Sequence, residues 1–250
     1  MVYDRVPSQT LWVEPSQFNV DDRATFKKSP NRSLSSSQAS MENQPSTHTD
    51  VGLNTKDSTP MTLDVLRSRR STKAVSAPGP SVEQLNVALQ AAARAPDHGA
   101  LRVWRFALIE QPDIVALGER AIEAVARAGK PMTPEKQAKT REWLKNVPLM
   151  VAMAYQIHHD NAKVPELEQT LSMGAAVMNF QNAMHAMGFA SFWSTGLGTY
   201  TDEVPTMLGF DPLDYRFVGF LSVGTPVGPV RDVPKMSSDL IWHRWTATEA

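Results

Sequence analysis

The sequence predicts a domain of mixed α and β structure over residues 61–250, with more helices than strands. Three observations carry this prediction. The run LMVAMAY at 149–155 is apolar throughout, which is typical of a strand buried on both faces of a sheet. The stretch WRFALIE at 104–110 alternates Trp, Phe and Leu with other residues, as a strand does. Between about 165 and 187, apolar residues recur every three or four positions, as on the buried face of a helix.

Residues 1–60 differ in composition from the rest of the chain. They include SPNRSLSSSQAS and MENQPSTHTD, which are rich in Ser, Thr, Gln and Asn and show little apolar periodicity. Such a segment buries too little apolar surface to offset the entropy lost on ordering. We therefore predict a disordered N-terminal extension over residues 1–60.

The elements of the first half of the domain follow from local signals. MTLDVLRSRRS is expected to be a short helix that runs into a group of cations. Ser81 and Gln84 form a capping-box pattern, which predicts that a helix begins at residue 82, and Pro96 is expected to end it. One face of this helix is expected to hold Val82, Leu85, Leu89 and Ala92.

The second half continues the mixed pattern. Helices are expected at about 113–128 and 134–145, and Gly188 is expected to end the long helix in a left-handed conformation. FASFWSTG and DYRFVGFLSVGTP predict two more strands, with a short helix at about 203–208 between them. The predicted core stripe of the long helix comprises Met173, Val177, Phe180, Met184 and Met187.

Composition and missing motifs exclude several classes of function. The formal net charge is −1, so no overall positive field would draw the chain to nucleic acid or to an anionic membrane. The absence of Cys excludes disulfides, thiol nucleophiles and Cys-ligated metals. No segment is apolar enough to cross a bilayer, and we expect a soluble, cytoplasmic protein.

Motifs for hydrolytic or nucleotide chemistry are missing too. The chain has no complete GxGxxG, GxxxxGK[ST], HExxH or GxSxG. The HHD at 158–160 is more typical of a loop than of a metal site, so no metal is predicted. His98 and His185 lack visible triad partners, so we predict no catalytic side chain and expect a cofactor to carry the chemistry.

The stretch RSRRSTKAVS at 67–76 gathers Arg67, Arg69, Arg70 and Lys73 within seven residues. A solvated helix end, a nucleic-acid contact and a phosphate-bearing cofactor are the alternatives, although nucleic-acid binding would favour more basic and aromatic neighbours. The planar fork of Arg, the mobile charge of Lys and the hydroxyl of Ser all suit phosphate oxygens. The cluster alone leaves these alternatives open.

Four segments in order, RRSTKAVS, RAPDHGALRVWRFALIE, MGFASFWSTG and VGFLSVGTP, resemble the nitroreductase family, in particular its small bacterial members that carry RAPDH. The resemblance spans about 61–231. It implies an α+β fold with a central, mostly antiparallel sheet wrapped by helices. It also implies a homodimer that binds FMN at each of two subunit interfaces, and it makes 61–250 an FMN-binding domain.

The resemblance also implies which residues bind the cofactor. The first segment would contact the phosphate, ribityl chain and ring edge of FMN, with the Lys stabilising negative charge near N1 and O2. The second would reach the FMN of the partner subunit, the third would lie beside the ring, and a late basic residue would lie near the phosphate. The residues of the first segment are Arg69, Arg70, Ser71 and Lys73, and those of the second are Arg94 and His98. Those of the third are Trp193, Ser194 and Thr195, and the late basic residue is Arg231.

The activity implied is that of an FMN-dependent oxidoreductase. NADH or NADPH would transfer hydride to flavin N5 and leave, and a nitroaromatic or quinone-like small molecule would then take its place in a ping-pong cycle. Other flavin chemistry of the same fold, such as dehydrogenation, dehalogenation or modification of flavin itself, is a second hypothesis. The third is a non-catalytic FMN-binding module whose N-terminal arm recruits a partner. The physiological acceptor and the preferred donor are left open.

Overall fold

The computed structural model describes residues 61–229, 233–234 and 236–246. The predicted extension over residues 1–60 and the predicted site residue Arg231 lie outside the described residues. The described residues all belong to one compact unit, Thr59–Ala250. None of its helices, in the part described, combines the length and the apolar content that crossing a membrane demands.

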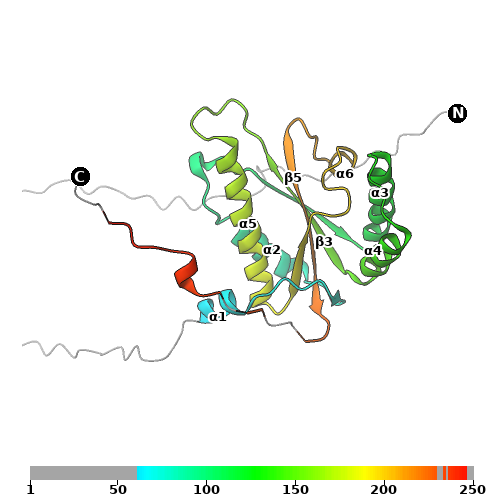
Figure 1. Cartoon of the computed structure of the whole chain (residues 1–250), viewed down its shortest axis with the longest axis horizontal. Coiled ribbons are helices and arrows are strands. Elements are labelled where there is room, and N and C mark those ends of the chain that lie inside the picture. The colour runs from blue at the N-terminus through cyan, green and yellow to red at the C-terminus, as the bar shows by residue number, and fades with distance from the viewer. Residues whose placement is uncertain (1–60, 230–232, 235, 247–250) are drawn as a thin grey trace, which may run out of the picture. The chain divides into compact units, whose positions relative to one another are not determined.

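One sheet runs through the centre of this unit (Figure 1). The path of hydrogen-bonded neighbours is β1–β5–β3–β2, and β4 also pairs with β5. Every pairing between these strands is antiparallel. The strands are β1 (Val75–Ser76), β2 (Trp104–Glu110), β3 (Leu149–Gln156), β4 (Ala190–Ser194) and β5 (Tyr215–Pro226).

Helices cover both faces of the sheet. Their bounds are α1 (Met61–Ser68), α2 (Val82–Ala92), α3 (Asp113–Arg127), α4 (Pro134–Asn146), α5 (Glu166–Ala186) and α6 (Glu203–Met207). Two 3₁₀ turns lie at His98–Ala100 and Ser238–Leu240. Helices α2 and α5 lie on one side of β3 and β5, and α3 and α4 lie on the other (Figure 1). The order of elements and the antiparallel sheet confirm the predicted α+β class.

Strand β3 is buried on both faces, as its apolar run predicted. Val151 and Met153 pack into the core that α2 and α5 cover. Met150 and Ala152 point the opposite way, into the core that α3, α4 and α6 cover. This alternation places one core on each side of the sheet, because successive side chains of a strand point to opposite faces.

Helix α2 begins where the sequence predicted. The Ser81 hydroxyl accepts a hydrogen bond from the Gln84 backbone, and the Gln84 side chain accepts one from the Ser81 backbone. On the predicted face, Leu85 and Ala92 are buried, whereas Val82 is 67% exposed because it occupies the first turn. The helix ends at Ala92, before Pro96.

Helix α5 is the longest helix of the described part, and it determines where the site residues lie. Four members of its predicted core stripe, Met173, Val177, Phe180 and Met184, are buried. The fifth, Met187, is the C-cap residue and is only partly buried. Gly188 follows its end with a φ of 88°. The Phe189 amide donates to the Met184 carbonyl and the Gly188 amide to the His185 carbonyl, the two bonds of a Schellman motif.

Candidate functional site

The basic segment, residues 67–73, is attached to the edge of β4. Ser71 forms a parallel bridge with Ser191, and the Thr72 amide donates to the Ser191 carbonyl at 3.0 Å. The Ser191 hydroxyl in turn accepts a hydrogen bond from the Gln181 side chain on α5. The structure therefore brings the first predicted segment against the strand that carries Trp193 and Ser194.

Positive charge is concentrated where the basic segment meets the end of α5. The Ser68 hydroxyl lies 2.9 Å from Nε2 of His185. Burial lowers the pKa of His185, and the charges of Arg69 and Arg70 lower it further. Nη1 of Arg69 is buried and has no hydrogen-bond partner among the described residues. A buried donor that carries part of a positive charge makes this region suited to holding an anion.

Lys73, at the end of the basic segment, contacts two aromatic rings. Its ammonium is 4.6 Å from the centre of the Trp143 ring and 6.0 Å from that of Phe192. Nε1 of Trp143 is buried and also lacks a hydrogen-bond partner in the described part of the chain. Sequence reasoning missed Trp143, and the signal available was one large aromatic residue on the otherwise polar helix PEKQAKTREWLKN.

The third predicted segment leaves β4 beside a bulged part of β5. The indole N–H of Trp193 donates to the Val218 carbonyl at 2.9 Å. The next residue, Gly219, has a φ of 113°, and a Cβ placed on it would lie 2.5 Å from the Ser194 carbonyl oxygen. Only glycine therefore allows β5 to pass so close to the segment. Thr195 follows the strand and is exposed.

The second predicted segment lies elsewhere in the same chain. Nδ1 of His98 is 2.6 Å from the Glu168 carboxylate, near the start of α5. Arg94 is exposed just beyond the end of α2. The Asp97 carboxylate accepts a hydrogen bond from the Arg102 amide, which closes the turn between α2 and β2.

His98 and the basic segment lie toward opposite ends of α5. His98 contacts Glu168, whereas the basic segment contacts His185, seventeen residues further along the helix. At 1.5 Å of rise per residue, these contact points are roughly 25 Å apart. One chain thus brings the first and third segments together, but it does not bring His98 to them.

Backbone strain is confined to the candidate segments. Among the described residues, the non-glycine residues with a positive φ are Ala100, Arg102 and Leu197. The first two lie in the turn that follows His98, and the third lies two residues after Thr195. Residues other than glycine rarely adopt this backbone conformation, because it costs about 1–3 kcal/mol. Such residues cluster at functional sites.

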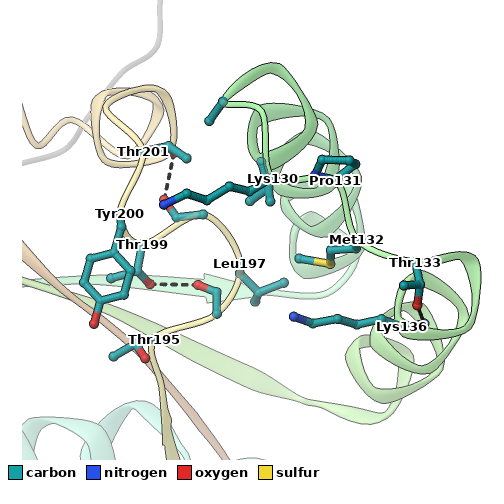
Figure 2. Close-up of a pocket in the computed structure, with 14 residues that line it drawn as sticks. Lys130, Pro131, Met132, Thr133, Lys136, Thr195, Leu197, Thr199, Tyr200 and Thr201 are labelled. Carbon is teal, nitrogen blue, oxygen red and sulfur yellow. Dashed lines mark hydrogen bonds between the residues drawn. The ribbon is translucent and has the colours of Figure 1, made fainter.

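A pocket of about 500 Å³ opens next to the third segment (Figure 2). One wall is the loop Thr195–Thr201. The other is formed by the connection between α3 and α4, which includes Lys130 and Met132, and by Lys136 in the first turn of α4. Hydrogen bonds from the Thr199 hydroxyl to the Gly196 carbonyl and from the Thr201 hydroxyl to the Gly198 carbonyl fix the first wall.

The HHD stretch forms part of the connection between β3 and α5. Nε2 of His159 lies 3.0 Å from the Leu213 carbonyl oxygen, and the His158 amide donates to the Gln169 side chain. Within the described ranges, no group of three or more His, Cys, Asp or Glu residues is placed to hold a metal ion.

Together these features define an α+β protein with a buried cationic donor at one strand edge and residues of positive φ in the nearby loops. The chain belongs to the nitroreductase family, because the model of that family matches residues 66–225. This confirms the family predicted from the four motifs. Over 167 residues, the chain is 35% identical to "Putative NAD(P)H nitroreductase YdjA" of Escherichia coli K12, an alignment that covers 66% of this chain and 87% of the relative.

Solved structures share the fold at low sequence identity. A nitroreductase-like family protein from Bacillus cereus matches with a TM-score of 0.62 and 18% identity, covering 75% of this chain and 97% of that one. A nitroreductase with bound FMN from Bacteroides fragilis matches with a TM-score of 0.57 and 20% identity, covering 73% and 98%. At these identities the likeness establishes the fold alone.

Proposed function

We propose that the protein is an FMN-dependent oxidoreductase that uses NADH or NADPH to reduce nitroaromatic or quinone-like acceptors. The observation that carries this proposal is a buried guanidinium nitrogen of Arg69 that has no hydrogen-bond partner among the described residues, in a segment attached to β4. Support comes from the family membership, from the E. coli relative named as an NAD(P)H nitroreductase and from the FMN-bound Bacteroides structure.

The described residues fit a flavin mononucleotide. A phosphate oxygen is a suitable acceptor for Nη1 of Arg69, because an unpartnered buried donor costs about 1–3 kcal/mol or more when charged. The exposed hydroxyl of Ser71 lies in the same segment. The indole N–H of Trp143 is a second buried donor without a partner among the described side chains, and a polar flavin edge would satisfy it.

Each of these residues would have a separate role in binding FMN. FMN, when bound, would supply hydride and electron transfer between the donor and the acceptor. Arg69 and Ser71 would hold the phosphate, while the Trp143 and Phe192 rings fix the ammonium of Lys73. That ammonium would favour negative charge on the nearby ring edge. Trp193 and Ser194, held against β5, would flank the ring, and this scheme needs no side chain as general acid or base.

A homodimer would complete the site. His98 lies too far from Arg69 to contact the same FMN within one chain, so a second copy would have to supply it. Helix α5 offers a surface for such a copy, because Leu167, Leu171 and Met178 are 68%, 64% and 43% exposed on it. Exposed apolar side chains gathered on one helix mark an interaction surface.

The test is a visible absorption spectrum of the purified protein, recorded before and after anaerobic addition of NADPH and then of NADH. We expect a flavin spectrum that bleaches with one or both donors. Arg69→Gln should weaken FMN binding tenfold or more, since a charge-assisted hydrogen bond is worth about 1.5–3 kcal/mol. Arg120→Gln, which removes the same charge from an exposed site on α3, should not. A colourless protein that ignores added FMN would overturn the proposal.

A further inference from the structure

Apart from Thr195, the residues that line the pocket between the Thr195–Thr201 loop and the α3–α4 connection have no role in holding FMN in the scheme above. Its volume of about 500 Å³ lies within the range of roughly 300–1,000 Å³ that small-molecule sites occupy. It begins at Thr195, beside the proposed position of the flavin ring, so a molecule in it would lie next to the reacting centre.

The charge in this pocket is entirely positive. The side chains of Lys130 and Lys136 extend from the α3–α4 side toward the Thr195–Thr201 loop (Figure 2). Among the described residues that line it, none is Asp or Glu. In the part of the chain that the structure describes, neither ammonium takes part in an ion pair or a side-chain hydrogen bond. Two uncompensated ammonium groups facing one cavity favour an anion within it.

The rest of the lining is mostly apolar. Val125, Pro131 and Met132 form one wall, and Leu197 lies opposite. The hydroxyls of Thr199 and Thr201 already donate to carbonyls of their own loop. Recognition by charge therefore falls to the two lysines, while the apolar walls suit an apolar or aromatic body.

We propose that this pocket binds an anionic group carried on an apolar or aromatic molecule, and thereby selects a substrate of the oxidoreductase. This inference rests on the proposed function. The anion would be a carboxylate, a sulfonate or a phosphate. Two sources share that chemistry: an acidic aromatic acceptor, and a phosphate of the nicotinamide donor, such as the 2′-phosphate that distinguishes NADPH from NADH.

The test uses Lys130→Gln, Lys136→Gln and the double variant in the full-length protein. Lys145→Gln is the control, because it removes the same charge from the far end of α4, where Lys145 makes only an exposed contact with Glu142. KM is measured for NADPH and for NADH with benzoquinone as acceptor, and for 4-nitrobenzoate and neutral 4-nitrobenzamide with NADH as donor. FMN content is read from the visible spectrum of every variant.

The double variant should raise KM about tenfold for at least one anionic partner, with kcat and KM for 4-nitrobenzamide retained, since charge-assisted hydrogen bonds are lost. A rise in KM for NADPH alone would identify the 2′-phosphate as the anion that the lysines bind. A rise for both dinucleotides would identify their diphosphate, and a rise for 4-nitrobenzoate would identify the carboxylate of the acceptor. If every KM stays unchanged in FMN-loaded, active protein, the inference is wrong while the proposed function stands.

A direct binding measurement further separates failure of this inference from failure of the proposed function. If the wild-type protein holds no FMN, the proposed function fails, and calorimetric titration with 4-nitrobenzoate and 4-nitrobenzamide still tests the pocket. Preference for the anion that the double variant abolishes and Lys145→Gln retains would support the site. Equal binding of both compounds, or none of either, would overturn it.

Discussion

The ammonium of Lys73 lies over the indole ring of Trp143, 4.6 Å from its centre. Such a cation–π contact is worth about 0.5–2 kcal/mol and joins residues seventy positions apart. Phe192 of β4 packs edge-on against the same indole at 6.5 Å. The basic segment, α4 and β4 therefore meet at the aromatic pair Trp143 and Phe192. The indole N–H of Trp143 has no hydrogen-bond partner among the described residues.

Trp143→Phe should separate cofactor binding from folding. It removes the unpartnered N–H but keeps an aromatic face for Lys73. We expect the FMN dissociation constant to rise about three- to tenfold, the worth of one hydrogen bond. The flavin-free protein should be as stable as the wild type or more so, because an unsatisfied buried donor is gone.

Fluorescence titration with FMN and thermal melts of flavin-free protein measure the two effects. Trp104→Phe is the control, because the Trp104 N–H already donates to the hydroxyl and carbonyl of Ser172. That variant should lose stability without a selective loss of FMN affinity. Unchanged FMN affinity in Trp143→Phe would remove this indole from the cofactor site.

Gly219→Ala should displace residues 193–195, because the added Cβ would collide with the backbone of Ser194. The new Cβ would lie 2.5 Å from the Ser194 carbonyl oxygen at a φ of 113°. We expect the free energy of unfolding to fall by about 2–4 kcal/mol, with weaker FMN binding in the protein that still folds. Gly129→Ala is the control, because it also has a positive φ but nothing within 4 Å of an added Cβ. A loss of stability in both variants, equal within error, would show that the contact with Ser194 is relieved by a small shift.

His185 should make stability depend on pH. Burial, and then the charges of Arg69 and Arg70, lower its pKa from the ordinary 6.5. The folded protein thus binds this proton less readily than the unfolded chain does. The stabilising effect is complete above about pH 6.5 and is lost as the pH falls toward the lower folded value.

His185→Gln should therefore flatten the decline in melting temperature between pH 7.5 and pH 5. His159→Gln, at an exposed histidine, serves as the control and should retain the wild-type slope. FMN phosphate beside Arg69 should offset part of the positive charge and raise the His185 pKa, so flavin binding would take up a proton. An NMR titration of His185 with and without FMN measures this shift, and no change on binding would place the phosphate elsewhere.

A shared site predicts complementation between two defective proteins. Arg69→Gln and His98→Ala would each lose flavin sites as homodimers. In a mixed dimer, one site carries both substitutions and the other carries neither. After random reassortment, about half of the dimers would be mixed and about a quarter of all sites intact. Turnover that reappears on mixing measures this, and no recovery in dimers shown to be mixed by two-tag purification would mean that one chain builds each site alone.

Local patterns predicted the elements whose own sequence determines them. The capping box of Ser81 and Gln84, the apolar run of β3 and the stripe of α5 each depend on residues within a few positions. Their bounds match the structure to within about one residue, except that α2 ends at Ala92, three residues before the predicted end. The two residues of β1 gave no such signal, because Val75 and Ser76 form a strand only through their pairing with β5.

The candidate site was predicted in part, and for a similar reason. The family motifs pointed to the basic segment and to residues 193–195, which the structure brings together. Trp143 contacts Lys73 only through the tertiary fold, and Lys130 and Lys136 face one pocket only because the α3–α4 connection folds over the Thr195–Thr201 loop. The left-handed conformations of Ala100, Arg102 and Leu197 were equally invisible, because these residue types do not favour a positive φ.

The length of α5 has a practical consequence for anyone who assays this protein. If each flavin is held by residues from both ends of α5, and hence from two chains, diluting the protein separates the halves that hold it. Dissociation of the dimer follows mass action, so the active fraction depends on protein concentration. Specific activity would then fall when stock solutions are diluted into an assay without FMN, and added FMN would restore it by favouring the assembled form.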